Sequence, residues 1–387
     1  MAAARKTATT TAIGVAALTG VVLMLVARRR RAARLRRFCR RLPKVELHAH
    51  LSGSIRPSTL LDLSAEHRGS EGEERARNTL GLSRGATRET RDLRECFAIF
   101  DLIHDAVRTK ENLRRITREV VADFAADNVK YLELRTTPRD LPDGTKRREY
   151  VSIVTSVLEA MSDLEEGGIT CRLLLSIDRA TADPAVAQAT VDLAREFQPV
   201  VVGIDVSGNP TRGSFSTFLP ALEAARAAGL SVTIHCGEVR GNDEEVTAMI
   251  NFHPDRLGHA LTLTREHCAT LLALPRRIPV ELCPTSNVKT LQLDSMTDHP
   301  TARLWVHQKY PFCVNTDDSG VFATDSSTEH FIFAEALNLD VVAMSTIACN
   351  AAGFSFLPTR EKAQLQNKIL RHCALLLWRD WISLGLL

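Results

Sequence analysis

Two histidines one residue apart, His48 and His50, end an apolar run near the start of the chain. In an extended strand, residues i and i+2 face the same side, so both imidazoles can reach a single ion. His235 and the pair Asp317-Asp318 end other apolar runs much farther along. Imidazoles with a carboxylate suit zinc, which keeps a position free for water in catalytic sites. The pattern predicts one metal site built from several strand ends; the alternative is partly buried histidines that only form hydrogen bonds within a core.

The elements that would position these residues are short β-branched runs that alternate with amphipathic helical stretches from residue 45 onward. The runs cover residues 45–50, 129–138, 169–178, 200–208, 230–238, 256–260, 278–287 and 312–320. Such alternation predicts a parallel sheet, and eight units over roughly 340 residues predict one closed (β/α)₈ barrel, an α/β fold of the TIM-barrel type.

Polar residues gather at the C-terminal ends of these runs, where barrel enzymes build their active sites. They are His48, His50, Thr136, Thr137, Asp178, Gly208, His235, Glu238, His259, Ser286, Asn287, Asp317 and Asp318. The distribution favours an enzyme whose site lies at that end of the barrel.

Helices are predicted where apolar residues recur at three- and four-residue spacing against charged faces, at 111–127, 148–166, 185–197 and 218–228. Between residues 66 and 95 the chain turns polar and rich in glycine. We expect a mobile excursion there, after the first strand and over the mouth of the site.

Residues 1–41 form a basic extension, and 42–387 form the predicted barrel with C-terminal helices. The first 44 residues hold twelve Lys or Arg and no acid, which leaves 37 basic against 46 acidic residues in the remainder. The folded part is therefore acidic, with a net charge of −9. The basic balance of the whole chain does not indicate nucleic-acid binding.

Within this extension, residues 11–27 are an uncharged, mostly apolar stretch of 17 residues followed by four arginines. The length is at the short edge of what crosses a bilayer, and we interpret the stretch as a membrane anchor. Positive charge on its C-terminal side would leave the catalytic domain in the cytosol. A secretory signal and an organellar transit peptide are the alternatives, and the lack of an A-x-A-like cleavage site disfavours the first.

Nine cysteines are spread along the chain without a spacing pattern. Such a distribution fits reduced thiols better than a disulfide framework. It favours a reducing compartment, in agreement with a cytosolic catalytic domain.

Four motifs resemble the adenosine and AMP-type deaminases of the amidohydrolase superfamily over about residues 42 to 360. They are Leu42-Pro43-Lys44-Val45-Glu46-Leu47-His48-Ala49-His50-Leu51, His235-Cys236-Gly237-Glu238, Gly258-His259 and Asn315-Thr316-Asp317-Asp318. Segments 131–139, 203–210 and 281–289 are most similar to the adenosine deaminase-like branch, whose members remove methylamine from N6-methyl-AMP.

The resemblance implies that His48, His50, His235 and Asp317 hold one Zn²⁺ per chain, with a water completing the shell. A metal lowers the pKa of such a water from 15.7 toward ~7, which makes hydroxide available for attack on C6 of the purine. Glu238 would be the general acid that protonates ring N1.

The resemblance also implies that His259 orients the hydroxide and stabilises developing charge. Asp318 would accept a hydrogen bond from water or the purine edge, which requires a bend after Asp317, and the sequence Asp318-Ser319-Gly320 permits one. Gly208 would let the backbone approach the base. An ordinary turn glycine is the alternative.

Ser52 bears on the substrate class, because adenosine deaminases proper carry an aspartate two residues after the second histidine. A carboxylate there would repel a 5′-phosphate, whereas a serine hydroxyl can donate to it. Nucleotide-specific relatives usually carry asparagine at this place, so the serine departs from both patterns. It argues for a nucleotide over a nucleoside.

The phosphate would meet Thr136, Thr137, Pro138 and Arg139, where two hydroxyls and a guanidinium follow a strand. The alternative is a proline-containing loop with a solvent-facing arginine. The resemblance further implies that His104 and Asp178 contact phosphate or ribose. Without the resemblance, they could equally be a helix-surface histidine and a strand-end cap. His50 would also border the substrate.

The sequence therefore predicts a monomeric, zinc-dependent hydrolase that converts N6-methyl-AMP, and other N6-substituted purine nucleotides, to IMP and an amine. The alternative is an adenosine deaminase that converts adenosine to inosine. A third hypothesis, a tethered binding protein without activity, is disfavoured because a non-enzyme has no need of Glu238 beside a metal.

Overall fold

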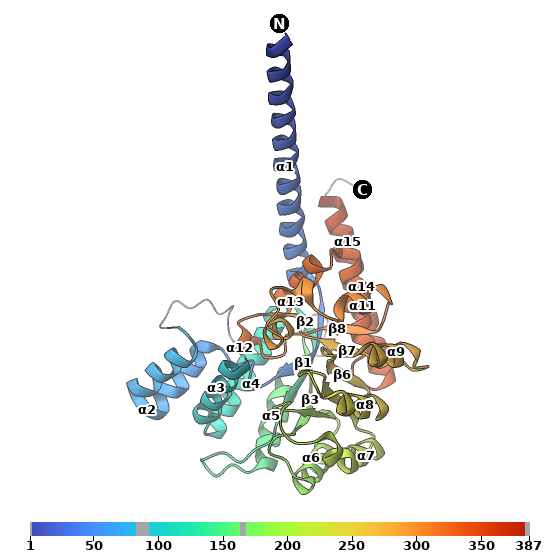
Figure 1. Cartoon of the computed structure of the whole chain (residues 1–387). Coiled ribbons are helices and arrows are strands. Elements are labelled where there is room, and N and C mark those ends of the chain that lie inside the picture. The colour runs from blue at the N-terminus through green and yellow to red at the C-terminus, as the bar shows by residue number, and fades with distance from the viewer. Residues whose placement is uncertain (1, 83–92, 163–167, 384–387) are drawn as a thin grey trace.

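Eight parallel strands form one sheet in the computed structural model, which describes residues 2–82, 93–162 and 168–383, with side chains in α1 described from residue 22 (Figure 1). The strands pair in chain order, from β1 to β8. They are β1 (Lys44–His50), β2 (Val129–Thr136), β3 (Thr170–Asp178), β4 (Val201–Ser207), β5 (Ser231–Cys236), β6 (Arg256–His259), β7 (Val280–Leu282) and β8 (Phe312–Val314). All eight predicted runs contain a strand, and the predicted TIM-barrel fold is confirmed.

The chain just after β8 meets β1 and brings the two ends of the sheet together. The backbone N–H of His50 donates to the carbonyl of Asp317 over 3.0 Å, and the N–H of Asp317 donates to the carbonyl of His48 over 2.8 Å. Ala49 and Asp317 form a parallel bridge. The junction therefore uses the same short segments that carry the predicted metal ligands.

Helices surround this barrel and extend beyond it. They are α1 (Ala2–Arg41), α2 (Pro57–Thr79), α3 (Leu93–Ala106), α4 (Lys110–Ala126), α5 (Arg147–Met161), α6 (Pro184–Glu196), α7 (Leu219–Ala227), α8 (Asp243–Asn251), α9 (Arg265–Ala273), α10 (Pro284–Thr290), α11 (Ala302–His307), α12 (Ser319–Phe322), α13 (Ser326–Ala336), α14 (Val341–Gly353) and α15 (Thr359–Ser383). Two 3₁₀ turns, η2 (Phe215–Phe218) and η3 (Met296–Asp298), join them.

The four helices predicted from periodicity correspond to α4, α5, α6 and α7; residues 163–166 of the second prediction lie outside the described residues. Their ends follow from local chemistry. The hydroxyl of Thr109 accepts from the N–H of Asn112, whose side chain caps in return, and Asp183 accepts from the N–H of Val186 at the start of α6. Each cap satisfies backbone donors that the first helical turn leaves free.

The polar excursion predicted for residues 66–95 is wrong over its first part. α2 continues through Gly69, where φ of +61° marks a kink, and ends at Thr79. Glu and Arg at helical spacing support it, as in the ion pair between Arg77 and Glu73. Residues 83–92 lie outside the described residues, and no described residue of 66–82 lines the main cleft. α3 contributes the covering side chains instead.

α1 projects away from the barrel, with its C-terminal turns packed on the barrel and its N-terminal end free (Figure 1). Leu35, Phe38 and Cys39 are buried, whereas every side chain from 22 to 31 is exposed. Most of the predicted anchor 11–27 has side chains outside the description. Among the helices searched over the described residues, none is apolar enough over a sufficient length to qualify as a membrane span. The anchor is not supported by this finding.

Candidate active site and metal centre

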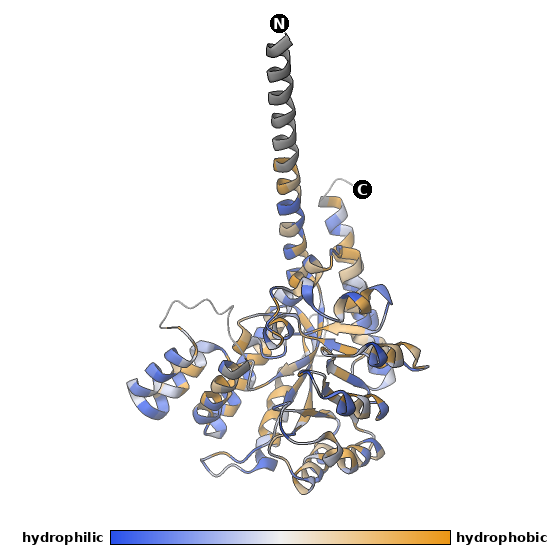
Figure 2. Cartoon of the chain, in the orientation of Figure 1, coloured by the Kyte–Doolittle hydropathy of each residue, from blue (hydrophilic) through white to orange (hydrophobic). Residues whose placement is uncertain are grey.

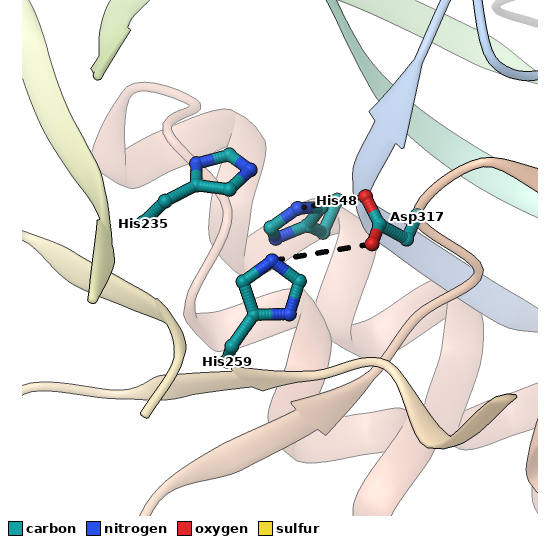
Figure 3. A group of neighbouring side chains, drawn as sticks. All are labelled: His48, His235, His259 and Asp317. Atoms are coloured by element: carbon teal, nitrogen blue, oxygen red, sulfur yellow. Dashed lines mark ion pairs between the residues drawn. The ribbon is translucent and has the colours of Figure 1, made fainter. Parts of the chain in front are cut away.

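Four predicted ligands meet at the C-terminal end of the barrel. His48 and His50 come from the end of β1, His235 from β5, and Asp317 from the residue pair after β8. The Nε2 atoms of His48 and His50 each lie 3.3 Å from Oδ1 of Asp317, and Nε2 of His50 lies 3.1 Å from Nε2 of His235. Figure 3 shows His48, His235 and His259 turned toward Asp317. Residues separated by up to 269 positions thus share one small volume.

Buried carboxylates hold two of these rings in the orientation that a metal ligand needs. Oε2 of Glu281 accepts from Nδ1 of His48 over 2.6 Å, and Oδ1 of Asp205 accepts from Nδ1 of His235 over 3.0 Å. With Nδ1 donating to the carboxylate, Nε2 of each ring points into the site, where it can bind a metal once it carries no proton. Carboxylates in this outer position orient metal-bound histidines and raise their basicity.

The facing lone pairs provide a direct test of whether a cation fits. Nε2 of His48 is buried and makes no hydrogen bond within the described residues, although Oδ1 of Asp317 lies opposite it. Unprotonated nitrogens and a carboxylate oxygen repel one another at this distance unless a positive charge lies between them. The arrangement fits a divalent cation. Neutral imidazoles with one carboxylate are a ligand set that suits zinc.

The electrostatics of the same residues agree with a cation site. Burial acts to raise the pKa of Asp317, yet the neighbouring His48 ring holds that pKa well below its usual range. Burial lowers the pKa of His50 well below its usual range, so this ring is neutral. Burial also acts to lower the pKa of His235, but the Asp205 carboxylate raises it to about 9 overall. Without a metal, His235 therefore carries a proton where the metal would bind.

Arg135 ties the two orienting carboxylates together inside the barrel. Its Nη1 lies 3.1 Å from Oδ1 of Asp205, and its Nη2 lies 3.0 Å from Oε2 of Glu281. All three side chains are fully buried. Burial acts to raise the pKa of each carboxyl, but His235 and Arg135 lower the pKa of Asp205, and Arg135 and Arg256 lower the pKa of Glu281. Both carboxylates are consequently ionised.

The proton on His259 is assigned by a chain of hydrogen bonds. Nδ1 of His299 accepts from the backbone N–H of Ala302 over 3.1 Å, so the ring proton of neutral His299 lies on Nε2. Nε2 of His299 and Nδ1 of His259 each lie 3.0 Å from the Asn287 carboxamide between them. Neighbours decide which end of a carboxamide is oxygen. The carboxamide is drawn with its oxygen facing His259 and its nitrogen facing His299, but a protonated Nε2 on His299 requires the reverse orientation. In that orientation the Asn287 nitrogen donates to Nδ1 of His259, and the His259 proton lies on Nε2.

This assignment separates His259 from the ligands. The atoms of His48, His235, His259 and Asp317 lie within 4.8 Å of one another, so position alone would permit His259 to bind the cation. An Nε2 that carries hydrogen cannot coordinate a metal, but it can donate a hydrogen bond to an oxygen held there. Its pKa is lowered to about 3 by burial, so the ring is neutral. The geometry favours His50 as the third imidazole ligand.

Glu238 lies beside the cluster because the chain turns after β5. Gly237 adopts φ of +65°, a left-handed conformation that glycine takes without strain, and this brings Glu238 back over the barrel end. Oε1 of Glu238 lies 3.7 Å from Nε2 of His259. Burial raises the pKa of Glu238, and the negative charge of Asp317 adds to the effect of burial while His235 opposes it. A carboxyl with a raised pKa can carry a proton near neutral pH, as a general acid must.

Asp318 also reaches the site, and the bend that permits it is at Asp317 itself and not after it. Asp317 has φ of +65°, which turns the next residue toward the cleft. Oδ1 of Asp318 is buried and has no partner among the described residues. A Cβ on Gly53 would lie 1.7 Å from that oxygen, so only glycine leaves room for it. Burial and the charge of Asp317 raise the pKa of Asp318 well above its usual range.

A cleft of about 900 Å³ opens over this cluster. Every residue predicted to contact substrate lines it: His50, Ser52, His104, Thr136, Thr137, Pro138, Arg139, Asp178, Gly208, Glu238 and Asp318. His235, His259 and Asp317 form its floor, whereas His48 lies beneath the lining. The cleft is large enough for a small organic ligand.

Several outer residues already have partners within the chain. The Thr136 hydroxyl lies 2.9 Å from the Tyr150 hydroxyl, and Arg139 donates to the Val107 carbonyl over 2.8 Å. Asp178 accepts from the N–H of Ala180 and the hydroxyl of Thr181, which is the geometry of a strand-end cap. Thr137 and His104 are exposed. The outer wall thus offers the exposed hydroxyl of Thr137, the imidazole of His104 and the part of the half-buried Arg139 guanidinium that does not contact Val107.

Gly208 has a local reason to be glycine. Its φ is +100°, and a Cβ there would lie 2.1 Å from Oδ1 of Asp178. The close neighbour is therefore a carboxylate of this chain. The backbone of Gly208 also borders the cleft.

Sequence reasoning missed the groups that support the ligands. Asp205 and Glu281 are single acids within the apolar strands β4 and β7, and Arg135 is a fully buried base at the end of β2; a charged residue in a buried strand was the available signal. Gly53 and Arg147 were also missed. Arg147 lines the cleft and donates to the Pro138 carbonyl over 3.1 Å, but it stands one residue before the predicted helix.

Known proteins similar to this chain cover nearly all of the barrel. The family model described as Adenosine deaminase matches residues 43–372. N6-mAMP deaminase of Arabidopsis thaliana is 41% identical over 347 residues, which cover 84% of this chain and 95% of the relative. N6-Methyl-AMP deaminase-L of Xenopus laevis is 38% identical over 343 residues, covering 86% and 94%.

Solved structures agree with these relatives. The crystal structure of the Arabidopsis N6-mAMP deaminase superposes with a TM-score of 0.79 at 41% identity, covering 86% of this chain and 99% of that one. A crystal structure of Arabidopsis ADAL complexed with IMP superposes with a TM-score of 0.78 at 40% identity, covering 86% of this chain and 97% of that one.

Proposed function

Because the chain belongs to the adenosine deaminase family, we propose that it catalyses the hydrolytic deamination of N6-methyl-AMP to IMP and methylamine. The family predicted from four sequence motifs is thereby confirmed. The observation that carries the proposal is the convergence of His48, His50, His235 and Asp317 beside Glu238, on the floor of a cleft. Relatives at 38 to 41% identity that bear the name of this activity support the substrate.

The cation in this proposal is one Zn²⁺ per chain, held by His48, His50, His235 and Asp317. A bound zinc ion supplies a water whose pKa is lowered from 15.7 toward ~7. Support comes from the unprotonated nitrogens that face Asp317 and from the carboxylates that orient two of the rings.

The chain's own residues then divide the remaining work. Glu238, with its raised pKa, delivers a proton to N1 of the purine and makes C6 electrophilic. His259 donates from Nε2 to the oxygen that adds at C6. Asp318 has a free buried oxygen and a raised pKa, which suits a hydrogen bond to the purine edge. Gly208 lets the base lie against backbone.

The 5′-phosphate belongs, in this proposal, to the outer wall of the cleft. Ser52, Thr137 and Arg139 offer donors there and no carboxylate replaces Ser52, so a nucleotide is accepted where an aspartate would repel it. Asp178 and His104 border the ribose and phosphate. Thr136 and Pro138 shape the wall, since the Thr136 hydroxyl already lies against Tyr150.

We further propose that the catalytic unit is a cytosolic monomer, with residues 1–41 as an N-terminal extension that packs on the barrel through its last turns and attaches it to a membrane through 11–27. An organellar location is the alternative. All proposed ligands and Glu238 come from one chain, so the reaction does not require a second subunit. The exposed apolar side chains at 22–26 support attachment.

A substrate panel tests the function directly. The full-length protein is assayed on N6-methyl-AMP, AMP, N6-methyladenosine and adenosine, with zinc content measured in the same sample by mass spectrometry. We expect one zinc per chain and the highest kcat/KM on N6-methyl-AMP, with IMP and methylamine released in equal amounts. A preference for adenosine would contradict the nucleotide proposal, and zinc-free protein with full activity would contradict the metal.

A further inference from the structure

The helices at the two ends of the chain expose apolar side chains at one pole of the molecule. α1 and the C-terminal part of α15 project from the same side of the barrel, and both carry hydrophobic residues there (Figures 1 and 2). On α15, Trp378 and Trp381 are 53% and 41% exposed. On α1, five consecutive residues are exposed, namely Val22, Leu23, Met24, Leu25 and Val26. Large apolar side chains gathered in this way mark an interaction surface.

The exposed apolar residues of α15 form a stripe. Leu375, Trp378 and Ile382 follow one another at three- and four-residue spacing, so they share a face of the helix. The opposite face is used by the fold, since Cys373 and Leu376 are buried. Burial of one face against the barrel therefore leaves a second apolar face without a partner in the described chain.

An ion pair holds the two helices together at this pole. Nε of Arg34 lies 3.1 Å and 3.2 Å from the two carboxylate oxygens of Asp380, and Nη2 of Arg34 also contacts that carboxylate. Asp380 stands between Trp378 and Trp381 in sequence. The tryptophans are consequently held beside α1 in a defined place.

The charge of the pole identifies its partner. Residues 28–41 contain nine arginines and no acidic residue, and Arg28, Arg29, Arg30 and Arg31 are all exposed. Only Ala27 separates these four from the exposed apolar residues 22–26. Each basic residue near an anionic lipid surface contributes about 1 kcal/mol of attraction. A second copy of the chain would bring the same arginines into mutual repulsion, whereas a negatively charged surface would not.

We propose that α15 and α1 together form a membrane-docking surface, with Trp378 and Trp381 seated at the interface of a bilayer that contains anionic lipids. Tryptophan favours this interface because its ring is apolar and its N–H is polar. Arg28 to Arg31 meet the lipid headgroups, and the apolar residues 22–26 lie on the hydrocarbon side. The surface is independent of the deaminase chemistry and lies on helices that contribute no residue to the cleft.

The chain carries a convenient probe for this surface. It has three tryptophans, and Trp305 is fully buried in the core, so any change on lipid binding reports on the two in α15. Full-length protein is titrated with vesicles of phosphatidylcholine alone or of phosphatidylcholine and phosphatidylserine in equal parts, with brominated acyl chains as quencher. We expect binding and tryptophan quenching on the anionic vesicles, both weakened by salt.

A variant pair makes the test specific. Trp378→Ser with Trp381→Ser should lower vesicle partitioning at least about tenfold, in keeping with the loss of two buried aromatic rings. Leu370→Ser is the matched control, because Leu370 is 57% exposed on the same helix but lies about 12 Å nearer the barrel than Trp378. It should partition like the unmodified protein.

Two results would overturn the proposal. Vesicle binding that leaves the tryptophans unquenched would show that α1 binds without α15. A blue shift of tryptophan emission that grows with protein concentration in the absence of lipid would assign the surface to self-association. Neither result bears on deamination, which is measured separately.

Discussion

The floor and the outer wall of the cleft are built in different ways. At the floor, three imidazoles are each held by a second buried group: Glu281 orients His48, Asp205 orients His235, and Asn287 orients His259. On the outer wall, Thr137 and His104 are exposed, and Arg139 has one backbone partner. The comparison indicates that the chemistry of the floor is set before substrate arrives. The outer wall can adjust to what the substrate carries at its 5′ end.

The largest effect should follow loss of a ligand on the floor. His235→Ala removes a nitrogen and leaves Asp205 without its partner, so we expect zinc to be lost and kcat to fall by about 10⁴-fold or more. Metal analysis and activity on N6-methyl-AMP measure both. His307→Ala, at an exposed helical histidine, is the control and should retain its zinc.

Removal of the acid should separate metal binding from turnover. Glu238→Gln keeps the size of the side chain but cannot deliver a proton, so zinc stays while kcat falls by about 10²-fold or more. Normal turnover in this variant would refute the assigned role.

The pH dependence provides an independent test of the same group. The raised pKa of Glu238 means that the protonated, active form persists above the usual range of a carboxyl, and activity is lost as pH rises through that pKa. The descending limb of kcat against pH should therefore be absent from Glu238→Gln. A limb that persists unchanged belongs to another group.

Loss of an orienting carboxylate should lower the affinity for zinc more than it lowers the activity of the zinc-loaded enzyme. Asp205→Asn and Glu281→Gln weaken the hydrogen bonds that hold the His235 and His48 rings, and we expect zinc affinity to drop by about 10- to 100-fold. Competition with a chelator measures this change. An unchanged affinity for zinc would show that the His235 and His48 rings do not need these carboxylates to bind the metal.

On the outer wall, the expected effect is confined to substrate binding. Arg139→Ala should raise KM for N6-methyl-AMP by about tenfold, since a charged hydrogen bond to phosphate contributes about 1.5–3 kcal/mol. KM for N6-methyladenosine should not change. Arg148→Ala, which removes an exposed guanidinium paired with Glu196, is the matched control. An equal loss on nucleoside and nucleotide would place the phosphate elsewhere.

The smallest effect should come from the group that assigns the His259 proton. His299→Ala removes the acceptor and donor pair that sets the Asn287 carboxamide, so His259 should populate both tautomers. We expect kcat to fall severalfold with zinc content unchanged, and ¹⁵N chemical shifts of His259 would report the tautomer directly. An unchanged tautomer would contradict the assignment of the His259 proton through His299 and Asn287.

The strand ends were the part of the molecule that sequence reasoning could locate. Strand periodicity and the rule that barrel sites lie at C-terminal strand ends place His48, His235, Glu238 and Asp317 together without coordinates. The supporting groups follow no such rule, because Asp205 meets His235 from the neighbouring strand and Glu281 meets His48 from two strands away, and neither acid lies near its histidine along the chain. The left-handed turn at Asp317 was also beyond reach, since a non-glycine residue gives no sign of a positive φ.

The helix α2 was predicted wrongly from the sequence. Glycine and charge density predicted an irregular excursion, but Gly69 only kinks the helix, and the charged residues pair along its surface. The prediction relied on composition and did not take into account that these charges recur at helical spacing. The helix that does border the cleft is α3, and only its His104 was assigned to the site from the sequence.

Asp317 joins the last strand to the first through its backbone and supplies a carboxylate from its side chain. A nascent chain therefore has no complete set of the proposed metal ligands until its final quarter has been synthesised and the barrel has closed. Ions that arrive earlier meet histidines without their acidic partner. Metal loading should thus report completed folding, and amide exchange at His50 and Asp317 should slow when zinc is added to the finished protein.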